Sequence, residues 1–284
     1  MKKFIYFFFT IIISIYFFNI ASAQDITTGK KNKAFFTIDV SGFYSLPLLD
    51  LRSSDDLKNF WNFTDYGIAK GLGTSLNFKF AVYTTKMMQL RTYVTLAYSH
   101  YSNDDNRAYI VQYPNQNWIN LGWPYTGGAN GSPYVPHDTT GVSNIRINNP
   151  QFAVGFEIGV YTDRANKSCF NFGLDYDANL FTGRIYQTYG LGEESFNTIS
   201  PSIRFGLGIN TVYAYKFDQY FGFHVGSRFQ ISNLFGKSSE MSDQTGYLGL
   251  LDKGNSVLNT NLGSGRTIAD LRFFGGISIY LGKM

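Results

Sequence analysis

The amino-acid sequence predicts an all-β fold, an up-and-down antiparallel transmembrane β-barrel of about eight strands, and three observations support it. Aromatic residues make up 18% of the 284-residue chain and charged residues only 15%, against about 25% in soluble domains. Polar and apolar residues alternate with a period of two in several segments, as in strands with one apolar face. The links between these segments alternate between short and long.

The alternation defines eight expected strands, each longer than the 9–11 residues that a tilted strand needs to cross a bilayer. The segments are 34–46, 71–83, 88–102, 150–161, 169–183, 200–216, 220–234 and 267–281. On the apolar face of these segments there is no Asp, Glu, Lys or Arg, although such residues are 15% of the chain. The charged residues of the strands therefore share the opposite face.

The size of an eight-stranded barrel decides which face points outward. Its interior is just wide enough for side chains to fill, so it cannot hold the many Phe, Leu, Ile and Tyr residues of the apolar face. We therefore expect the apolar face to point outward, where it needs lipid around it. Closure of the barrel also removes strand edges, whose unpaired backbone groups are costly in hydrocarbon. A soluble ligand-binding barrel is largely excluded by the same reasoning.

The links indicate which end of each strand lies on which side of the membrane. Short links are expected at 84–87, 162–168 and 217–219, and long links at 47–70, 103–149, 184–199 and 235–266. Strict alternation places all short turns at one end of the barrel and all long loops at the other. We expect short periplasmic turns, long extracellular loops and both termini of the barrel in the periplasm.

Residues 1–23 are typical of a secretory signal peptide. Lys2 and Lys3 precede an apolar run from Phe4 to Phe18, and Ala21-Ser22-Ala23 is a small-residue cleavage site. The run is shorter than the roughly 20 apolar residues of a membrane-spanning helix. The sequence thus predicts two parts, a cleaved signal peptide at 1–23 and an outer-membrane β-barrel domain at 24–284.

The polar face of the strands carries five acids and five bases, which we expect to form a charge network in the lumen. They are Asp39, Lys79, Arg91, Glu157, Asp175, Asp177, Arg204, Arg228, Asp270 and Arg272. Asp175 and Asp177 share a face and could serve in acid–base chemistry, or they could pair with arginines that neutralise a packed lumen. The balance of signs favours pairing, so any conduction is expected to be narrow or gated.

The chain resembles the eight-stranded outer-membrane barrels of Gram-negative bacteria, the porin-like and OmpA-like families. The resemblance is one of architecture, carried by the strand pattern and the signal peptide. It implies an integral outer-membrane protein whose partners are outer-membrane lipids, lipopolysaccharide and the barrel-assembly machinery. A structural or interaction role, or limited passage of small solutes, fits such a barrel, with an extracellular ligand or protein bound by the loops.

The strand tip His100-Tyr101-Ser102-Asn103 resembles the His-x-Ser-Asn signature of the outer-membrane lipid A deacylases, which are also eight-stranded barrels. By this resemblance Ser102 is the nucleophile and His100 the base. The alternative function is therefore a lipid A-modifying esterase of the outer leaflet. Glu157 is expected to face inward, so Asp104 or Asp105 would have to orient the imidazole. The competing interpretation is a polar strand end at the membrane boundary.

The longest expected loop, 103–149, is rich in aromatic residues among Asn, Gly and Pro. We expect Trp118, Trp123, Tyr125 and Tyr134 to form a recognition surface. Alternatively the loop packs on itself, with parts near 107–113 and 117–123 extending the barrel strands.

Other classes of site have little support in the sequence, and no cofactor is expected. His100, His137 and His224 lie far apart and lack the spacing of metal ligands. A single cysteine, Cys169, excludes an internal disulfide. The net charge of +4 is scattered, so nucleic acid is not an expected partner.

Overall fold

The computed structural model describes residues 36–52, 67–85, 87–103, 109–111, 139–163, 165–188, 194–240, 243–244, 247–253 and 265–281. The predicted signal peptide and the four aromatic residues of the predicted recognition surface lie outside them. The strands are β1 (Phe36–Leu49), β2 (Lys70–Thr84), β3 (Met88–Ser102), β4 (Tyr109–Val111), β5 (Thr139–Tyr161), β6 (Ser168–Thr188), β7 (Glu194–Lys216), β8 (Phe221–Phe235), β9 (Tyr247–Leu248) and β10 (Ile268–Leu281). No part of the chain that is described contains a helix that could cross a membrane.

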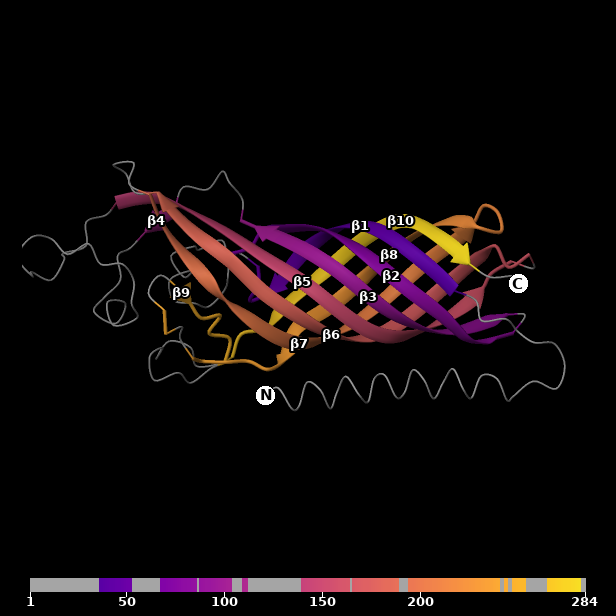
Figure 1. The fold of residues 1–284 in the computed structure, drawn as a ribbon. Helices are drawn as coiled ribbons and strands as arrows, with labels where there is room; N and C mark the ends of the chain where they lie inside the picture. Colours follow the sequence, from indigo (N-terminus) through magenta and orange to yellow (C-terminus); the bar gives the residue numbers. More distant parts are fainter. Residues whose placement is uncertain are drawn as a thin grey trace, which may run out of the picture.

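Eight of these strands close an up-and-down barrel, which confirms the predicted fold class. The pairing runs β3-β2-β1-β10-β8-β7-β6-β5, and β3 pairs with β5 to complete the circle. Every pair in this circle is antiparallel. The first and last strands form one seam, from Phe36 opposite Leu281 to Leu49 opposite Ile268. Figure 1 shows the twisted barrel with β1 beside β10.

The two faces of each strand differ as the alternation predicts. On β8 the outward Val225 and Phe229 are exposed, whereas the inward His224 and Arg228 are buried. Large apolar side chains are exposed on all eight barrel strands. An exposed apolar surface of this extent is the lipid-facing band of a membrane barrel.

The two ends of the barrel are built differently. We call the end that holds the β2–β3, β5–β6 and β7–β8 links and the barrel termini the turn end, and the opposite end the loop end. Two turns at the turn end are fixed by aspartates. Asp163 Oδ1 accepts the backbone N–H of Lys167 at 2.8 Å, and Asp218 Oδ1 accepts the N–H groups of Tyr220 and Phe221 at 2.7 Å.

The expected long link at 184–199 is wrong. Most of it is strand, because β6 continues to Thr188 and β7 starts at Glu194. β5 likewise starts at Thr139, inside the expected loop 103–149, and pairs with β4. β5, β6 and β7 therefore form a wall beyond the end of β3, which continues roughly 20 Å along β5 and roughly 13 Å along β6 and β7. Figure 1 shows this wall projecting past the other strands.

Candidate functional site

The lumen contains the polar side chains that the alternation placed there, and they form clusters along the barrel axis. The turn-end cluster consists of Asp39, Lys79, Arg91 and Glu157, all buried. Lys79 Nζ lies 2.8 Å from Asp39 Oδ2 and 3.1 Å from Glu157 Oε2. Arg91 Nη2 lies 2.6 Å from Glu157 Oε1. Arg91 and Glu157 are directly opposite each other on β3 and β5, so strand register alone brings this pair together.

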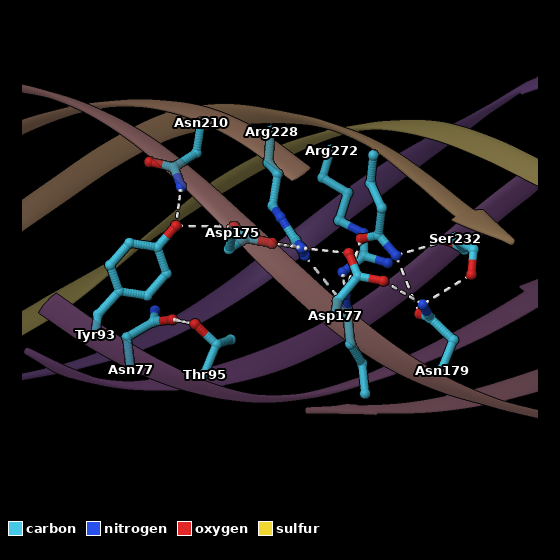
Figure 2. A network of polar contacts seen from close by, with 12 residues as sticks. Asn77, Tyr93, Thr95, Asp175, Asp177, Asn179, Asn210, Arg228, Ser232 and Arg272 are labelled. Carbon is cyan, nitrogen blue, oxygen red and sulfur yellow. Dashed lines mark hydrogen bonds and ion pairs between the residues drawn. The ribbon is translucent and has the colours of Figure 1, made fainter. Parts of the chain in front are cut away.

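The central cluster is organised around Arg228. Its guanidinium binds Asp175 and also Asp177, whose Oδ2 is 3.1 Å from Arg228 Nη2. Tyr93 donates to Asp175 Oδ2 at 2.8 Å and accepts from Asn210 Nδ2 at 2.7 Å. Figure 2 shows Asp175 and Asp177 converging on the same guanidinium. The geometry therefore matches charge neutralisation, the alternative to acid–base chemistry for these two carboxylates.

The β7 sequence explains how Arg228 on β8 reaches β6. Gly208 lies opposite Asp175 between the two strands, where a side chain would otherwise intervene. A Cβ at residue 208 would lie 2.6 Å from both Arg228 Nη2 and Asp175 Oδ1. The glycine leaves room for this close approach.

The mouth cluster lies toward the loop end and is organised around Arg272. Arg272 donates to Asp270 Oδ2 at 2.7 Å, to Gln151 Oε1 at 2.7 Å and to Tyr101 Oη at 3.3 Å. Ser45 donates to the same Asp270 oxygen at 2.6 Å. Gln151 also accepts from Arg228 at 3.3 Å and so joins this cluster to the central one.

A residue that the sequence did not reveal completes the set. Asp252, in the link between β8 and β10, accepts two hydrogen bonds from Arg204 at 2.9 Å, from Nε to Oδ2 and from Nη2 to Oδ1. It also accepts from Asn233 Nδ2 at 2.8 Å and from the backbone N–H of Ser238 at 3.0 Å. The link is thus held against the inside of the barrel. Asp252 lies outside any alternating pattern, so nothing in the sequence distinguished it.

An apolar cluster occupies the loop end of the lumen, and we call it the plug. It joins inward residues of five strands to residues of two links. Its members are Leu51, Ile68, Tyr101, Ile145, Ile147, Phe181, Ile199, Leu250 and Ile268. The polar lumen predicted from the sequence is therefore covered at this end by apolar side chains.

Little open space remains between the turn-end and central clusters. A cavity of about 50 Å³ is lined by polar groups that include Asp39, Lys79, Tyr93, Asp175 and His224. This volume accommodates only a few water molecules. Side chains of the described residues therefore fill most of the lumen between these two clusters.

The strand-tip residues lie on the opposite, outward surface. His100 and Ser102 are both partly exposed near the loop end of β3. His100 Nδ1 lies 2.8 Å from Asn148 Oδ1, which also accepts from Tyr98 Oη at 2.8 Å. No hydrogen bond joins His100 to Ser102. Glu157 is buried in the lumen and cannot reach them, and Asp104 and Asp105 lie outside the described residues.

Within the described ranges, no three His, Cys, Asp or Glu side chains lie close enough together to hold a metal ion. Cys169 is buried as a free thiol whose Sγ lies 3.2 Å from Asn171 Oδ1.

In comparisons with known proteins, the chain matches only solved structures. No family model and no curated protein matches the chain. The attachment invasion locus protein Ail of Yersinia pestis is 6% identical with a TM-score of 0.37, over 87% of this chain and 99% of that one. Neisserial surface protein A is 14% identical with a TM-score of 0.33, over 87% and 96%. The outer membrane protein OprG from Pseudomonas aeruginosa is 11% identical with a TM-score of 0.36, over 88% and 97%. The fold assignment of this chain rests on its own strand pairing.

Proposed function

We propose that the protein is an integral outer-membrane barrel with a structural or interaction role, and that it binds its partners at the loop end. One observation carries this proposal, a lumen filled with buried charged side chains inside an apolar outer surface. Buried ion pairs fill the interior, and the plug covers them at the loop end. A barrel built in this way supports contacts at its rim better than passage of solutes.

The projecting wall of β5, β6 and β7 supports the choice of the loop end for these contacts. It continues beyond the level at which β3 ends. The predicted aromatic residues Trp118, Trp123, Tyr125 and Tyr134 lie between β4 and β5 in the sequence. We propose that an extracellular ligand or protein binds there.

The test combines location with topology. A protease-cleavage site inserted after Gly128 is expected to be cut in intact cells, whereas the same insertion after Asp163, at the turn end, is expected to be cut only after the outer membrane is opened. Outer-membrane fractionation and heat-modifiable gel mobility report membrane insertion and barrel closure. Recovery as a soluble periplasmic monomer, or cleavage with the reverse pattern, overturns the proposal.

A second candidate function is a lipid A-modifying esterase of the outer leaflet, with Ser102 as nucleophile and His100 as base. The observation in its favour is the Asn148 oxygen at 2.8 Å from His100 Nδ1. A donor role for Nδ1 leaves Nε2 unprotonated and able to accept a proton. Mass spectrometry of lipid A from cells with the intact protein and with Ser102→Ala tests this function. Identical acylation patterns in both exclude it.

A further inference from the structure

A row of basic side chains crosses the outer surface at the loop end of the barrel. In the strand register, Ser102 on β3 lies opposite Lys70 on β2 and opposite Arg146 on β5. Arg146 in turn lies opposite Arg184 on β6. We call the three basic residues Lys70, Arg146 and Arg184 the basic row, and Ser102 lies between the first two. Directly opposed residues of an antiparallel pair have Cα atoms about 4.5–5.5 Å apart, so Lys70 and Arg146 flank the Ser102 hydroxyl closely.

The basic row points away from the lumen. Opposed residues share a face of the sheet, and Lys70 has the same parity along β2 as the exposed Leu72. Arg146 and Arg184 are themselves exposed. Within the part of the chain that is described, neither Lys70 nor Arg146 forms an ion pair, and Arg146 lies over the Tyr186 ring at 5.6 Å. These two cations therefore do not belong to the neutralised network of the lumen.

The row also marks where the apolar band ends. Toward the turn end, the outward residues of the same strands include the exposed Leu72, Leu96, Tyr98 and Phe156. Between them and the row lie His100 and Asn148, hydrogen-bonded to each other. Long basic side chains at such a boundary keep their charges at headgroup level while their stems contact apolar surface.

The turn end has a different boundary. Its outward residues form an aromatic cluster in which the rings of Tyr215, Phe217 and Phe223 lie within 6.0 Å of one another, centre to centre. Aromatic rings suit a membrane–water interface without selecting a charge. The boundary on β7 and β8 at the turn end is thus aromatic, whereas the boundary on β2, β5 and β6 at the loop end carries the basic row.

We propose that Lys70, Ser102 and Arg146 bind a phosphate group of a phosphorylated lipid in the leaflet that surrounds the loop end. Lys and Arg form charge-assisted hydrogen bonds with phosphate, and the Ser102 hydroxyl between them supplies a further donor. This inference rests on the proposed placement of the barrel in the outer membrane, and it holds whether or not Ser102 has a catalytic role.

Native mass spectrometry of the full barrel, refolded in phosphatidylcholine nanodiscs with lipid A as the probe, tests the inference. Two lipids are compared, bis-phosphorylated lipid A and the same lipid A after removal of its phosphates. The wild-type protein is expected to retain the phosphorylated form at least tenfold better, since one charge-assisted hydrogen bond corresponds to about a tenfold change in affinity. Equal retention of the two lipids overturns the inference without any variant being needed.

A double variant, Lys70→Gln with Arg146→Gln, is expected to lose most of this preference. The matched control is Lys167→Gln with Lys253→Gln, which removes the same charge from exposed positions outside the row. Equal retention by the two double variants overturns the inference. Binding of inorganic phosphate more tightly than of the phosphorylated lipid A identifies a site for the free anion instead and also overturns it.

Heat-modifiable mobility measured on the same samples separates this inference from the proposed function. A closed barrel that lacks a phosphate preference contradicts the lipid site alone. A chain that gives no membrane-inserted barrel contradicts the proposed function itself.

Discussion

At the residue scale, the lumen shows how buried charges are tolerated in a narrow barrel. Arg228 binds Asp175 and Asp177 together, and Lys79 lies between Asp39 and Glu157. Burial of an ion pair changes the free energy of folding little when both charges are present. Loss of one charge leaves the other buried without compensation. The network is therefore sensitive to single substitutions.

We expect Arg228→Met to lower the free energy of unfolding by about 3–5 kcal/mol, because two carboxylates then face each other in the lumen. Urea unfolding of the refolded barrel in lipid vesicles measures this change. The triple variant Arg228→Met, Asp175→Asn, Asp177→Asn is expected to recover much of the loss. A loss for Arg228→Met no larger than that for the exposed Lys167→Met contradicts this account.

The lumen residues also show how far sequence reasoning extends. Period-two alternation suffices to assign Arg228 or Asp175 to the inward face, because strand geometry fixes the face of each residue. Alternation does not identify their partners, because Arg228 on β8 reaches β6 across Gly208 on β7. Asp252 was inaccessible to such reasoning because a link residue acquires its position from the whole fold.

At the scale of the element, β5 explains why the strand ends were misplaced. Within the apolar band its apolar residues are the outward Phe152, Val154 and Phe156. Beyond the band they are Ile145 and Ile147, which point inward to the plug. The apolar face thus changes sides within one strand, because the surroundings change from lipid to water. A prediction that keeps the apolar residues on one face throughout therefore ends the strand where this change occurs.

The seam between β1 and β10 depends on a close approach that can be tested at the same scale. A Cβ at Gly276 would collide with the Val40 carbonyl oxygen of the neighbouring strand, whereas a Cβ at Gly42 has nothing within 4 Å. We expect Gly276→Ala to destabilise the barrel by about 1–3 kcal/mol, as overpacking does. Gly42→Ala is the matched control on the same seam. Heat-modifiable gel mobility over a temperature series measures both, and equal midpoints contradict the prediction.

At the scale of the whole molecule, closure of the lumen and a continuous apolar exterior occur together. Among the described residues, ion pairs and the plug fill the lumen and leave a cavity of about 50 Å³. Large membrane barrels conduct because their width leaves an aqueous channel, which an eight-stranded barrel lacks.

We therefore expect the refolded protein to give no stepwise conductance in planar bilayers. A wide porin refolded in the same way is the positive control for insertion and detection. Salt in the chamber is not expected to change the result, because buried pairs are screened far less than exposed ones. Regular conductance steps from the intact chain contradict a closed lumen.

The seam between β1 and β10 affects when the barrel can close during folding. Phe36 pairs with Leu281, so the first strand of the barrel to be made has to wait for the last before the circle is complete. Contacts between residues so distant in sequence form slowly, and until they form, β1 and β10 each expose an unpaired edge able to recruit another chain. The interval between synthesis and closure is thus the stage at which this barrel most needs protection.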